Sequence, residues 1–445
     1  MKHQLHLFAF CLVWAFQVRA QEPSVYNFSL NEAIDYAQKH QNAILNAQID
    51  ENIAKNTVKQ TIGIGLPQVS GSYSFQDYID IPTVIIPASF FGKPGDPDIR
   101  AKFGTKYQSS VGADISQLLF DGSYIVGIQA SKTYKELSVR NLKRTRIETA
   151  VAVTKAYYSV LVNNEQLTLI DANLVRLRKS LEDTEALFQN GLVEKIDVDR
   201  LSVLKNNLET ERENVVRLLG LNNNLLKFQM GMPIQMQLTL KETISSLQME
   251  PVTMVSDTVV YQNRIEYGLL QTRKKLNELD LKRYKSQFLP SAVAFGNVSR
   301  SFMSDDFSTI FSNNFPVTSV GLKVSLPIIS GGQRLYHVRN AKLEVLKSEN
   351  DIHDLKNAIN LEVSMAQTKY INGIQSLENQ KRNMKLAKEV LDVSRIKYEQ
   401  GVGSSLEVTT AETSSKEAEN NYINALYDML INKVNLDKAL GKINY

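Results

Sequence analysis

The residue types that most often carry catalysis are scarce in this chain and poorly spaced for it. After the first twenty residues there is no cysteine, and the only histidines are His40, His337 and His353, which lie in helical patterns without the spacing of metal ligands. Gly63-Ile64-Gly65 precedes a strand pattern and not a helix, so it does not fit a dinucleotide-binding turn. We therefore predict no enzymatic activity, no cofactor and no metal site.

Two acidic residues stand out because each follows a glycine that ends a long helical pattern. Asp197 comes shortly after Gly191, and Glu407 shortly after Gly401. In a single chain each acid would lie in the first turn of the next helix, where it interacts favourably with the helix dipole by about 0.3 to 1 kcal/mol. Around a symmetry axis, copies of the same carboxylates would repel one another and attract cations. The sequence leaves both interpretations open.

The elements that position these acids are very long helices. From Gln333 to Gln400 apolar residues recur at steps of three and four, close to the period of about 3.5 that is typical of coiled coils. Such a helix would be on the order of 100 Å long. A turn at 401–405 and a returning helix to Leu440 complete a hairpin. The first half predicts a similar pair, from after Gly122 to near Gln189 and from about Asp197 to Phe228.

Four short segments alternate apolar and polar residues with the period of a β-strand. They lie at 68–76, at 110–116, around Val293 and Phe295, and at 319–326. The loop from Ile79 to Lys106 is rich in proline and glycine, so we expect no regular structure there. We expect a polar loop from Ser301 to Asn314. Before the strands, Ser29 and Glu32 form a capping-box pattern at a helix start, and a second helical stretch runs from about Asn42 to Ile62.

The two halves of the chain repeat one order of elements. Three glycine pairs share a separation of 210 residues: Gly122 with Gly332, Gly191 with Gly401, and Gly231 with Gly441. The Leu-Pro pairs at 66–67 and 289–290 are 223 residues apart, so the loops differ in length. We predict a first repeat over 21–231, a connector over 232–256 and a second repeat over 257–445.

The first twenty residues have the pattern of a secretory signal. Lys2 is followed by an apolar core from Leu5 to Phe16, and we expect cleavage after Ala20. The single cysteine, Cys11, lies within this segment, so we expect neither a disulfide nor a lipid-bearing cysteine after cleavage. No later segment has 18 consecutive apolar residues, so any membrane crossing must use strands. The formal charge of +4 and the lack of a basic cluster argue against nucleic acid as a partner.

Four strands cannot close a barrel in a membrane. An open sheet edge in lipid leaves backbone N–H and C=O groups unpaired, and each unpaired group costs several kcal/mol. Several chains must therefore combine their strands. Eight strands from a dimer would be filled by side chains, whereas twelve from a trimer begin to leave a lumen. We favour the trimer. A secreted coiled-coil structural protein or adhesin would not need the strands, and a general diffusion porin would need many strands per chain and no long helices.

Taken together, these segments resemble the TolC family of outer-membrane efflux proteins across essentially the whole chain after the signal. The matching motifs include the Leu-Pro pairs, Leu119-Phe120-Asp121-Gly122, the 327–332 segment Pro-Ile-Ile-Ser-Gly-Gly and both glycine turns. The resemblance implies a mainly α fold with a small β part: long antiparallel helical hairpins forming a trimeric α-barrel, topped by a twelve-stranded transmembrane β-barrel. It implies a passive exit duct in the outer membrane that works with a periplasmic adaptor (membrane fusion protein) and an inner-membrane pump of the RND, ABC or MFS type.

The resemblance also assigns roles to the hairpin tips. It implies that Asp197, Glu407, Tyr398 and Thr410 line a periplasmic pore constriction, although Tyr398 also fits a coiled-coil contact position. It implies adaptor contacts at the tips, which are Gly191, Leu192, Gly401, Val402 and Gly403. The chain departs from the family pattern at several positions. Thr410 replaces a second acidic residue, Ser404 and Ser405 replace an arginine, and Asn42-Ala43 and Arg264-Ile265 lack prolines that are often present.

Overall fold

The computed structural model describes residues 26–87, 90, 98–244, 261–443 and 445. The predicted signal, its cleavage point and Cys11 lie outside the described residues. Contacts divide the chain into two compact units, each built from separate segments. Unit 1 comprises Met1–Ile49, Arg140–Gly268 and His353–Tyr445, and unit 2 comprises Asp50–Val139 and Leu269–Ile352.

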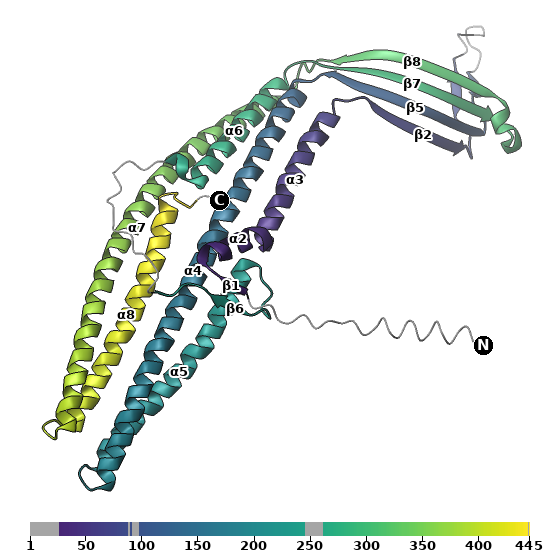
Figure 1. Ribbon diagram of the computed structural model, residues 1–445. Coiled ribbons are helices and arrows are strands. Elements are labelled where there is room, and N and C mark those ends of the chain that lie inside the picture. Colours follow the sequence, from purple (N-terminus) through teal and green to yellow (C-terminus); the bar gives the residue numbers. More distant parts are fainter. Residues whose placement is uncertain (1–25, 88–89, 91–97, 245–260, 444) are drawn as a thin grey trace, which may run out of the picture. The chain divides into compact units, whose positions relative to one another are not determined.

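A four-stranded antiparallel sheet lies in unit 2 (Figure 1). Its strands, in spatial order, are β2 (Gln68–Asp77), β5 (Tyr107–Phe120), β7 (Ser291–Ser304) and β8 (Asn314–Ser325). All four predicted strands are therefore present, each longer than the sequence pattern indicated. The central pair, β5 and β7, joins one strand from each half of the sequence.

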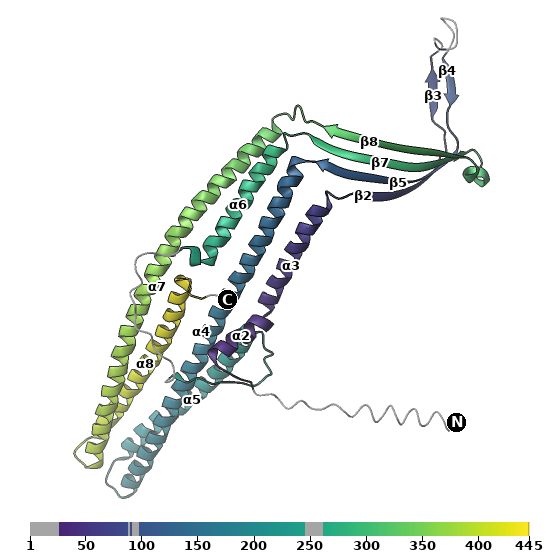
Figure 2. The ribbon, with the colours of Figure 1, turned by 45° about the horizontal axis from the view of Figure 1, so that its top comes forward.

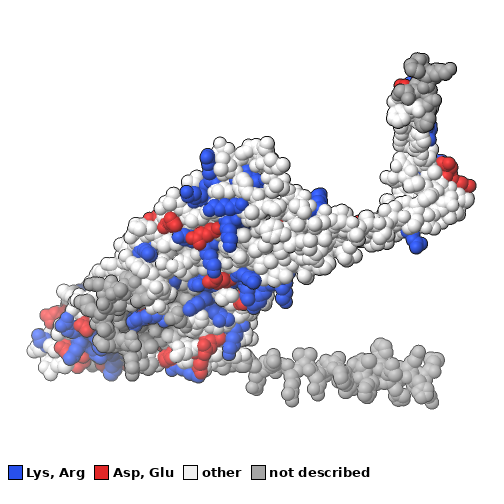
Figure 3. Space-filling view, turned by 90° about the horizontal axis from the view of Figure 1, so that it is seen from above, with Lys and Arg blue, Asp and Glu red and all other residues white. Residues whose placement is uncertain are grey.

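The alternation of side chains gives this sheet two different faces. One face is apolar and solvent-exposed over Val69, Tyr73, Phe75, Val111, Ile115, Val298, Val320, Leu322 and Val324. The opposite face is mostly polar: Ser74 and Ser110 hydrogen-bond at 2.8 Å, and Asn297 Nδ2 donates to Asp114 Oδ1 over 2.7 Å. A space-filling view coloured by charge shows few charged side chains over the strands, whereas Lys, Arg, Asp and Glu gather over the helices (Figure 3).

Two of the expected loops contain regular structure, so the sequence prediction was wrong there. In the 79–106 segment, β3 (Thr83–Ile86) pairs antiparallel with β4 (Ile99–Lys102). Four β-branched residues follow one another between Pro82 and Pro87, and this short run favours a strand despite the prolines on either side. In the 301–314 segment, β7 and β8 extend inward, and a 3₁₀ helix, η4 (Phe307–Ser312), occupies most of what remains. Asp306 caps it by accepting a hydrogen bond from Ser308 N over 2.9 Å.

Four helices contribute residues to both units: α3 (Asn42–Gly63), α4 (Gly122–Gln189), α6 (Ile265–Ser286) and α7 (Gln333–Glu399). Within unit 2, polar contacts join α6 to both long helices. Lys274 Nζ lies 2.9 Å from Glu349 of α7, and Lys275 Nζ lies 3.5 Å from Glu136 of α4. The helix that the sequence placed from about Asp257 begins later, at Ile265, after the 3₁₀ helix η3 (Tyr261–Asn263). Residues 245–260 lie outside the described part.

Unit 1 contains two helical hairpins. α4 pairs with α5 (Lys195–Met230), and α7 pairs with α8 (Ser405–Ala439); both views show each pair side by side and antiparallel (Figures 1 and 2). The predicted long hairpins are therefore present. A short helix, α2 (Leu30–His40), begins with the predicted capping box: Ser29 N donates to Glu32 Oε2 over 2.7 Å.

The core of unit 1 lies where α2 meets the hairpins. Its most buried members include Ala33, Ala37, Val153, Tyr157, Leu226, Met230, Leu426 and Met429. Beside it, β1 (Tyr26–Phe28) and β6 (Leu238–Leu240) form a parallel pair that the sequence did not predict. Three residues per strand are too few to show a period of two. Among the described residues no helix combines the length and apolarity that a membrane crossing requires.

Candidate functional site at the hairpin tips

The first hairpin turns through a glycine that closes the end of α4. Gly191 has a φ of 69°, in the left-handed region that favours glycine. The N–H of Gly191 donates to the carbonyl of Phe188 over 2.9 Å, and the N–H of Leu192 donates to that of Leu187 over 3.0 Å. These bonds satisfy carbonyls that the helix end would otherwise leave unpaired.

The second hairpin repeats this turn at the end of α7. Gly401 has a φ of 73°, its N–H donates to Tyr398 O over 3.0 Å, and Val402 N donates to Lys397 O over 2.9 Å. α8 then starts with Ser404 as its N-cap, whose Oγ accepts from Glu407 N over 3.2 Å. The two tips therefore share one backbone design.

Each tip exposes one large apolar side chain. Leu192 is 70% exposed and Val402 is 75% exposed. A Cβ added to Gly191 or Gly401 would meet nothing within 4 Å, so the backbone beside both side chains is open. An exposed apolar residue next to accessible backbone is well suited to contact with another protein.

Asp197, predicted for the constriction, is bound to its own helix. Its Oδ2 accepts from Glu194 N over 3.3 Å, and its Oδ1 lies 3.5 Å from Arg200 Nη1. Within one chain the carboxylate therefore helps to cap the start of α5, as the simpler interpretation of the sequence expected.

Glu407 and Thr410 lie on one groove between α7 and α8. The groove encloses about 550 Å³ and is lined by Ala387, Val390, Ser394, Leu406, Glu407, Thr410, Ala411 and Ser414. The hydroxyl of Thr410 donates to Leu406 O of its own helix over 2.8 Å. Asp197 lies on the other hairpin, and no hydrogen bond or ion pair between described residues joins it to Glu407.

Tyr398 is half-buried at the end of α7. Burial raises the pKa of its hydroxyl, the nearby carboxylate of Asp197 raises it further, and Thr184 of α4 acts in the opposite direction. The structure therefore brings Tyr398 within electrostatic range of Asp197, across the two hairpins. Two of the four predicted constriction residues therefore interact electrostatically within one chain.

A group of buried polar residues between α4 and α8 was not predicted from the sequence. Asn173 of α4 and Glu419 of α8 are 8% and 9% exposed, and Asn173 Nδ2 donates to Glu419 Oε2. Arg176 Nη2 donates in turn to Asn173 Oδ1. A detectable signal existed, because Glu419 continues the buried series Val408, Ala411, Ser415 at steps of three and four. An acid at such a position indicates a polar contact inside a helical interface.

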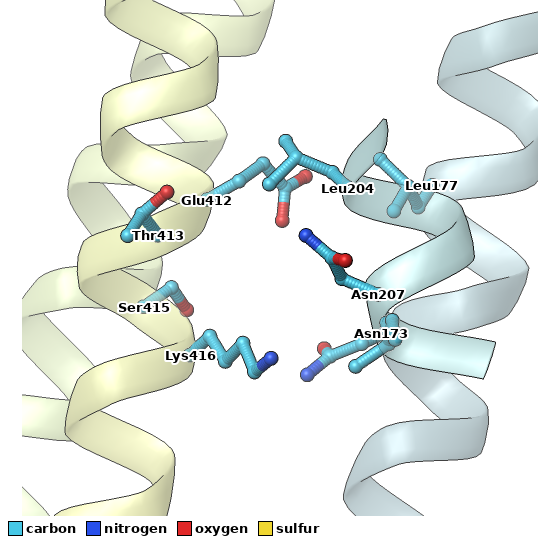
Figure 4. A pocket seen from close by; sticks show the side chains of 9 residues that line it. Asn173, Leu177, Leu204, Asn207, Glu412, Thr413, Ser415 and Lys416 are labelled. Atoms are coloured by element: carbon cyan, nitrogen blue, oxygen red, sulfur yellow. The ribbon is translucent and has the colours of Figure 1, made fainter. Parts of the chain in front are cut away.

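Beside this group is a cavity between α4, α5 and α8 (Figure 4). It encloses about 270 Å³ and is lined by Asn173, Leu177, Leu204, Asn207, Leu208, Glu412, Thr413, Ser415 and Lys416. Figure 4 shows the side chains of Glu412 and Asn207 pointing toward one another across it. Within the described ranges, histidine, cysteine, aspartate and glutamate side chains form no group of three or more that could hold a metal ion.

Comparison with known proteins identifies the family. The sequence model of the outer membrane efflux proteins matches residues 33–220 and 280–442, well over half of the chain. The chain belongs to the outer membrane efflux protein family. Both hairpins and all four strands of the sheet fall wholly or partly within the matched ranges.

Individual relatives of the efflux family are distant. The outer membrane protein TolC of Salmonella enteritidis is 22% identical over 356 residues, which are 76% of this chain and 70% of that protein. TolC of Escherichia coli (strain K12) is 25% identical over 308 residues, which are 65% of this chain and 60% of that protein. The second alignment thus spans less than two thirds of its relative.

The fold matches solved outer-membrane channels over nearly its whole length. The open-state structure of the MtrE outer membrane channel of Neisseria gonorrhoeae superposes with a TM-score of 0.75 at 19% identity, covering 93% of this chain and 88% of that one. The mainly helical fold with a small strand part is therefore that of the family's channels.

Proposed function

We propose that three copies of this chain form an outer-membrane exit duct. The duct would belong to a tripartite efflux or type I secretion system of a Gram-negative bacterium. Substrates would enter from an inner-membrane pump through a periplasmic adaptor and pass outward without energy input from the duct itself. The family consists of efflux channels and not of enzymes, which agrees with the lack of a catalytic motif in the sequence.

The observation that carries this proposal is the open sheet of unit 2. β2 and β8 each pair on one side only among the described residues, which leaves a row of backbone donors and acceptors at both edges. Because one face of the sheet is apolar and exposed, it is suited to lipid, and lipid cannot satisfy open edges. Pairing β8 of one copy with β2 of the next closes the sheet. Three copies give the twelve-stranded barrel with an open lumen.

Aromatic residues mark one end of the apolar face. The rings of Phe75 and Tyr107 lie 6.3 Å apart, and Phe307 lies 6.0 Å from the first and 5.6 Å from the second. Membrane barrels carry aromatic girdles where the lipid tails meet the headgroups. This cluster therefore supports an interfacial position for the loop-bearing end of the strands.

The two hairpins would continue the lumen as a helical tunnel in the periplasm. Gly191, Leu192, Gly401, Val402 and Gly403 would receive the adaptor, since Leu192 and Val402 are exposed on open backbone. We propose that the chain consists of two structural repeats, 21–231 and 257–445, joined by a connector over 232–256. Each repeat would contribute one of the two tips.

The constriction of the duct would be formed by Asp197, Glu407, Tyr398 and Thr410. In a trimer, three copies of each carboxylate near one axis would repel anions and attract cations. The proximity of Tyr398 to Asp197 supports this assignment, because the pair would join the two hairpins of one protomer at the narrow end.

Planar-bilayer recording of the purified full-length protein tests the proposed function. We expect small, discrete, cation-selective currents, together with a helix-dominated circular dichroism spectrum. A secreted coiled-coil protein or adhesin would be soluble without detergent and would give no current. A general diffusion porin would give large currents and a strand-dominated spectrum.

A further inference from the structure

The contact between α8 and the α4–α5 hairpin contains a buried carboxyl group without a full set of partners. Glu412 Oε1 is buried and has no hydrogen-bond partner, and the same is true of the Oγ of Ser415, a residue only 2% exposed. Both residues line the 270 Å³ cavity shown in Figure 4. A buried carboxylate oxygen without a donor is costly, whereas a protonated carboxyl can itself donate.

The cavity offers acceptors that a protonated Glu412 could reach. Asn207 faces it across the cavity with its amide nitrogen toward the carboxyl group, and a half-turn of the amide would present the oxygen as an acceptor (Figure 4). At about 30 Å³ per water in the liquid, the cavity also has room for several bridging waters. Three leucines in the lining, Leu177, Leu204 and Leu208, lower the local polarity and so disfavour the charged form.

Charged groups face the two glutamates from every neighbouring helix. Those facing Glu412 are Arg176 of α4, Arg395 and Asp392 of α7, and Glu419 and Lys416 of α8. Those facing Glu419 are Arg176, Lys388 of α7 and Glu211 of α5, and Glu211 is paired with Lys416. Burial raises the pKa of both carboxyl groups, and the arginines and lysines offset this only in part.

We propose that Glu412 is a proton-operated latch: in its neutral form it holds α8 against the α4–α5 hairpin, and ionisation loosens that contact. The proposal rests on the proposed function only in its consequence, because separation of the hairpins would widen the inner end of the duct. The sign follows from linkage. The pKa of this carboxyl group is higher in the closed contact than in the separated one. The group therefore stabilises the closed contact fully below the ordinary glutamate pKa of about 4.3, and that stabilisation is lost as pH rises through the pKa of the closed contact.

Distance measurement between the hairpins tests the latch directly. Spin labels on cysteines replacing Lys179 of α4 and Glu417 of α8, both exposed, report the separation in the full-length protein in detergent. We expect the population with separated hairpins, relative to the population with closed hairpins, to rise about tenfold between about pH 5 and about pH 8. Glu412→Gln, which is neutral at every pH, should keep the short distance throughout. Glu378→Gln on the exposed side of α7 should titrate like the unmodified protein.

A second variant keeps the test decisive if the glutamine perturbs folding. Glu412→Met replaces the carboxyl with an apolar side chain of similar volume, which buried ionic sites commonly tolerate. It too should give a short distance that does not change with pH. Wild-type distances independent of pH, or a titration that survives in both variants, would overturn the latch. Because the readout is a distance and not a current, a failure of conduction would leave this result unaffected.

Discussion

Gln41 and Arg264 close the ends of corresponding helices in the two halves of the chain. Gln41 Nε2 donates to the carbonyls of Phe228 and Gln229 at the end of α5, over 3.2 and 3.1 Å. Arg264 Nη1 donates to the carbonyl of Ala439 at the end of α8 over 2.8 Å. The two donors are 223 residues apart, the same separation as the two Leu-Pro pairs.

The glycines after these helix ends have matching surroundings. A Cβ on Gly231 would lie 2.5 Å from His40 O, and one on Gly441 would lie 2.8 Å from Asn263 O. Both glycines also have positive φ, 71° and 66°. The same cap and the same close approach therefore recur in both halves, which supports the proposed division into two repeats.

Replacing Arg264 should destabilise unit 1. Its side chain is 5% exposed and pairs with Glu266 at 3.1 Å and Glu362 at 2.7 Å. Arg264→Ala leaves both Glu266 and Glu362 without this cation. Because these carboxylates are 33% and 43% exposed, the expected loss lies below the roughly 3 to 5 kcal/mol that is typical of breaking a fully buried pair. The thermal unfolding midpoint of the detergent-solubilised protein, followed by circular dichroism, should fall clearly.

Two further variants isolate the cause of that loss. Arg382→Ala changes an exposed arginine that donates a hydrogen bond to Asn379 of its own helix, so the unfolding midpoint should stay near that of wild type. The double variant Arg264→Ala, Glu266→Ala should recover part of the loss, because it removes one of the two carboxylates that lose their cation and leaves only Glu362. Equal midpoints for the Arg264 single variant and the Arg382 control would contradict the assigned role.

Alanine at Gly401 should weaken the second tip. The added Cβ has free space, so its effect comes only from the positive φ, at a cost of about 1 to 2 kcal/mol. Gly127, in the interior of α4, also has free space but is helical, so Gly127→Ala should stabilise by about 0.5 to 1 kcal/mol. Hydrogen exchange at each site measures both effects. A stabilising Gly401→Ala would show that the tip backbone differs from the described turn.

Acid should loosen the docking of α2 through Glu32. The hydrogen bond from Lys241 and that from the backbone of Ser29 lower the pKa of Glu32 to about 2. Because this value lies below the ordinary one of about 4.3, the stabilisation is present above about pH 4.3 and is lost as pH falls toward about 2. Glu32→Gln should remove that part of the pH dependence of the unfolding midpoint.

The matched control for Glu32 is Glu51, which pairs with Lys55 at 2.7 Å within a single helix. Glu51→Gln should keep the acid slope of wild type, since Glu51 holds no second element in place. If Glu32→Gln and wild type lost stability in parallel over this range, the Lys241 contact would not be the source of the acid sensitivity.

The sequence predicted the long elements because their signals are repeated many times. Each long helix carries its apolar spacing over many turns, and Gly191 and Gly401 mark where the helices must stop. The short elements carry too little pattern. β3 holds four residues between prolines, and β1 holds three, so neither can be distinguished from a loop by periodicity.

The candidate site was only partly predictable for a different reason. The motifs predict that Tyr398 and Asp197 lie on separate hairpins. No local sequence pattern predicts that these two residues interact. The burial of Glu412 and Glu419 likewise depends on which face of α8 meets the other hairpin. Helix periodicity gives a face, and only the packing of two hairpins decides which polar residues that face covers.

The constriction can be tested by charge removal. Asp197→Ala and Glu407→Ala together should raise single-channel conductance and lower cation selectivity, because the three copies of each carboxylate that give the constriction its negative potential would be gone. Thr410→Asp should act in the opposite direction by adding an acid on the groove that contains Glu407. Asp354→Ala, at a side chain 84% exposed, serves as the control. Currents unchanged both in the double variant and in Thr410→Asp would remove these residues from the pore.

The claim that this chain is one third of a duct is tested most directly by cross-linking the free sheet edges. Cys11 is the only natural cysteine, so Ser72→Cys in β2 can be combined in turn with a cysteine at Val317, Ser319 or Lys323 in β8. For a pair in register between neighbouring copies, oxidation in membranes should give covalent species of two and three copies and none larger. Cross-links confined to single chains, or a ladder that continues beyond three copies, would contradict the account.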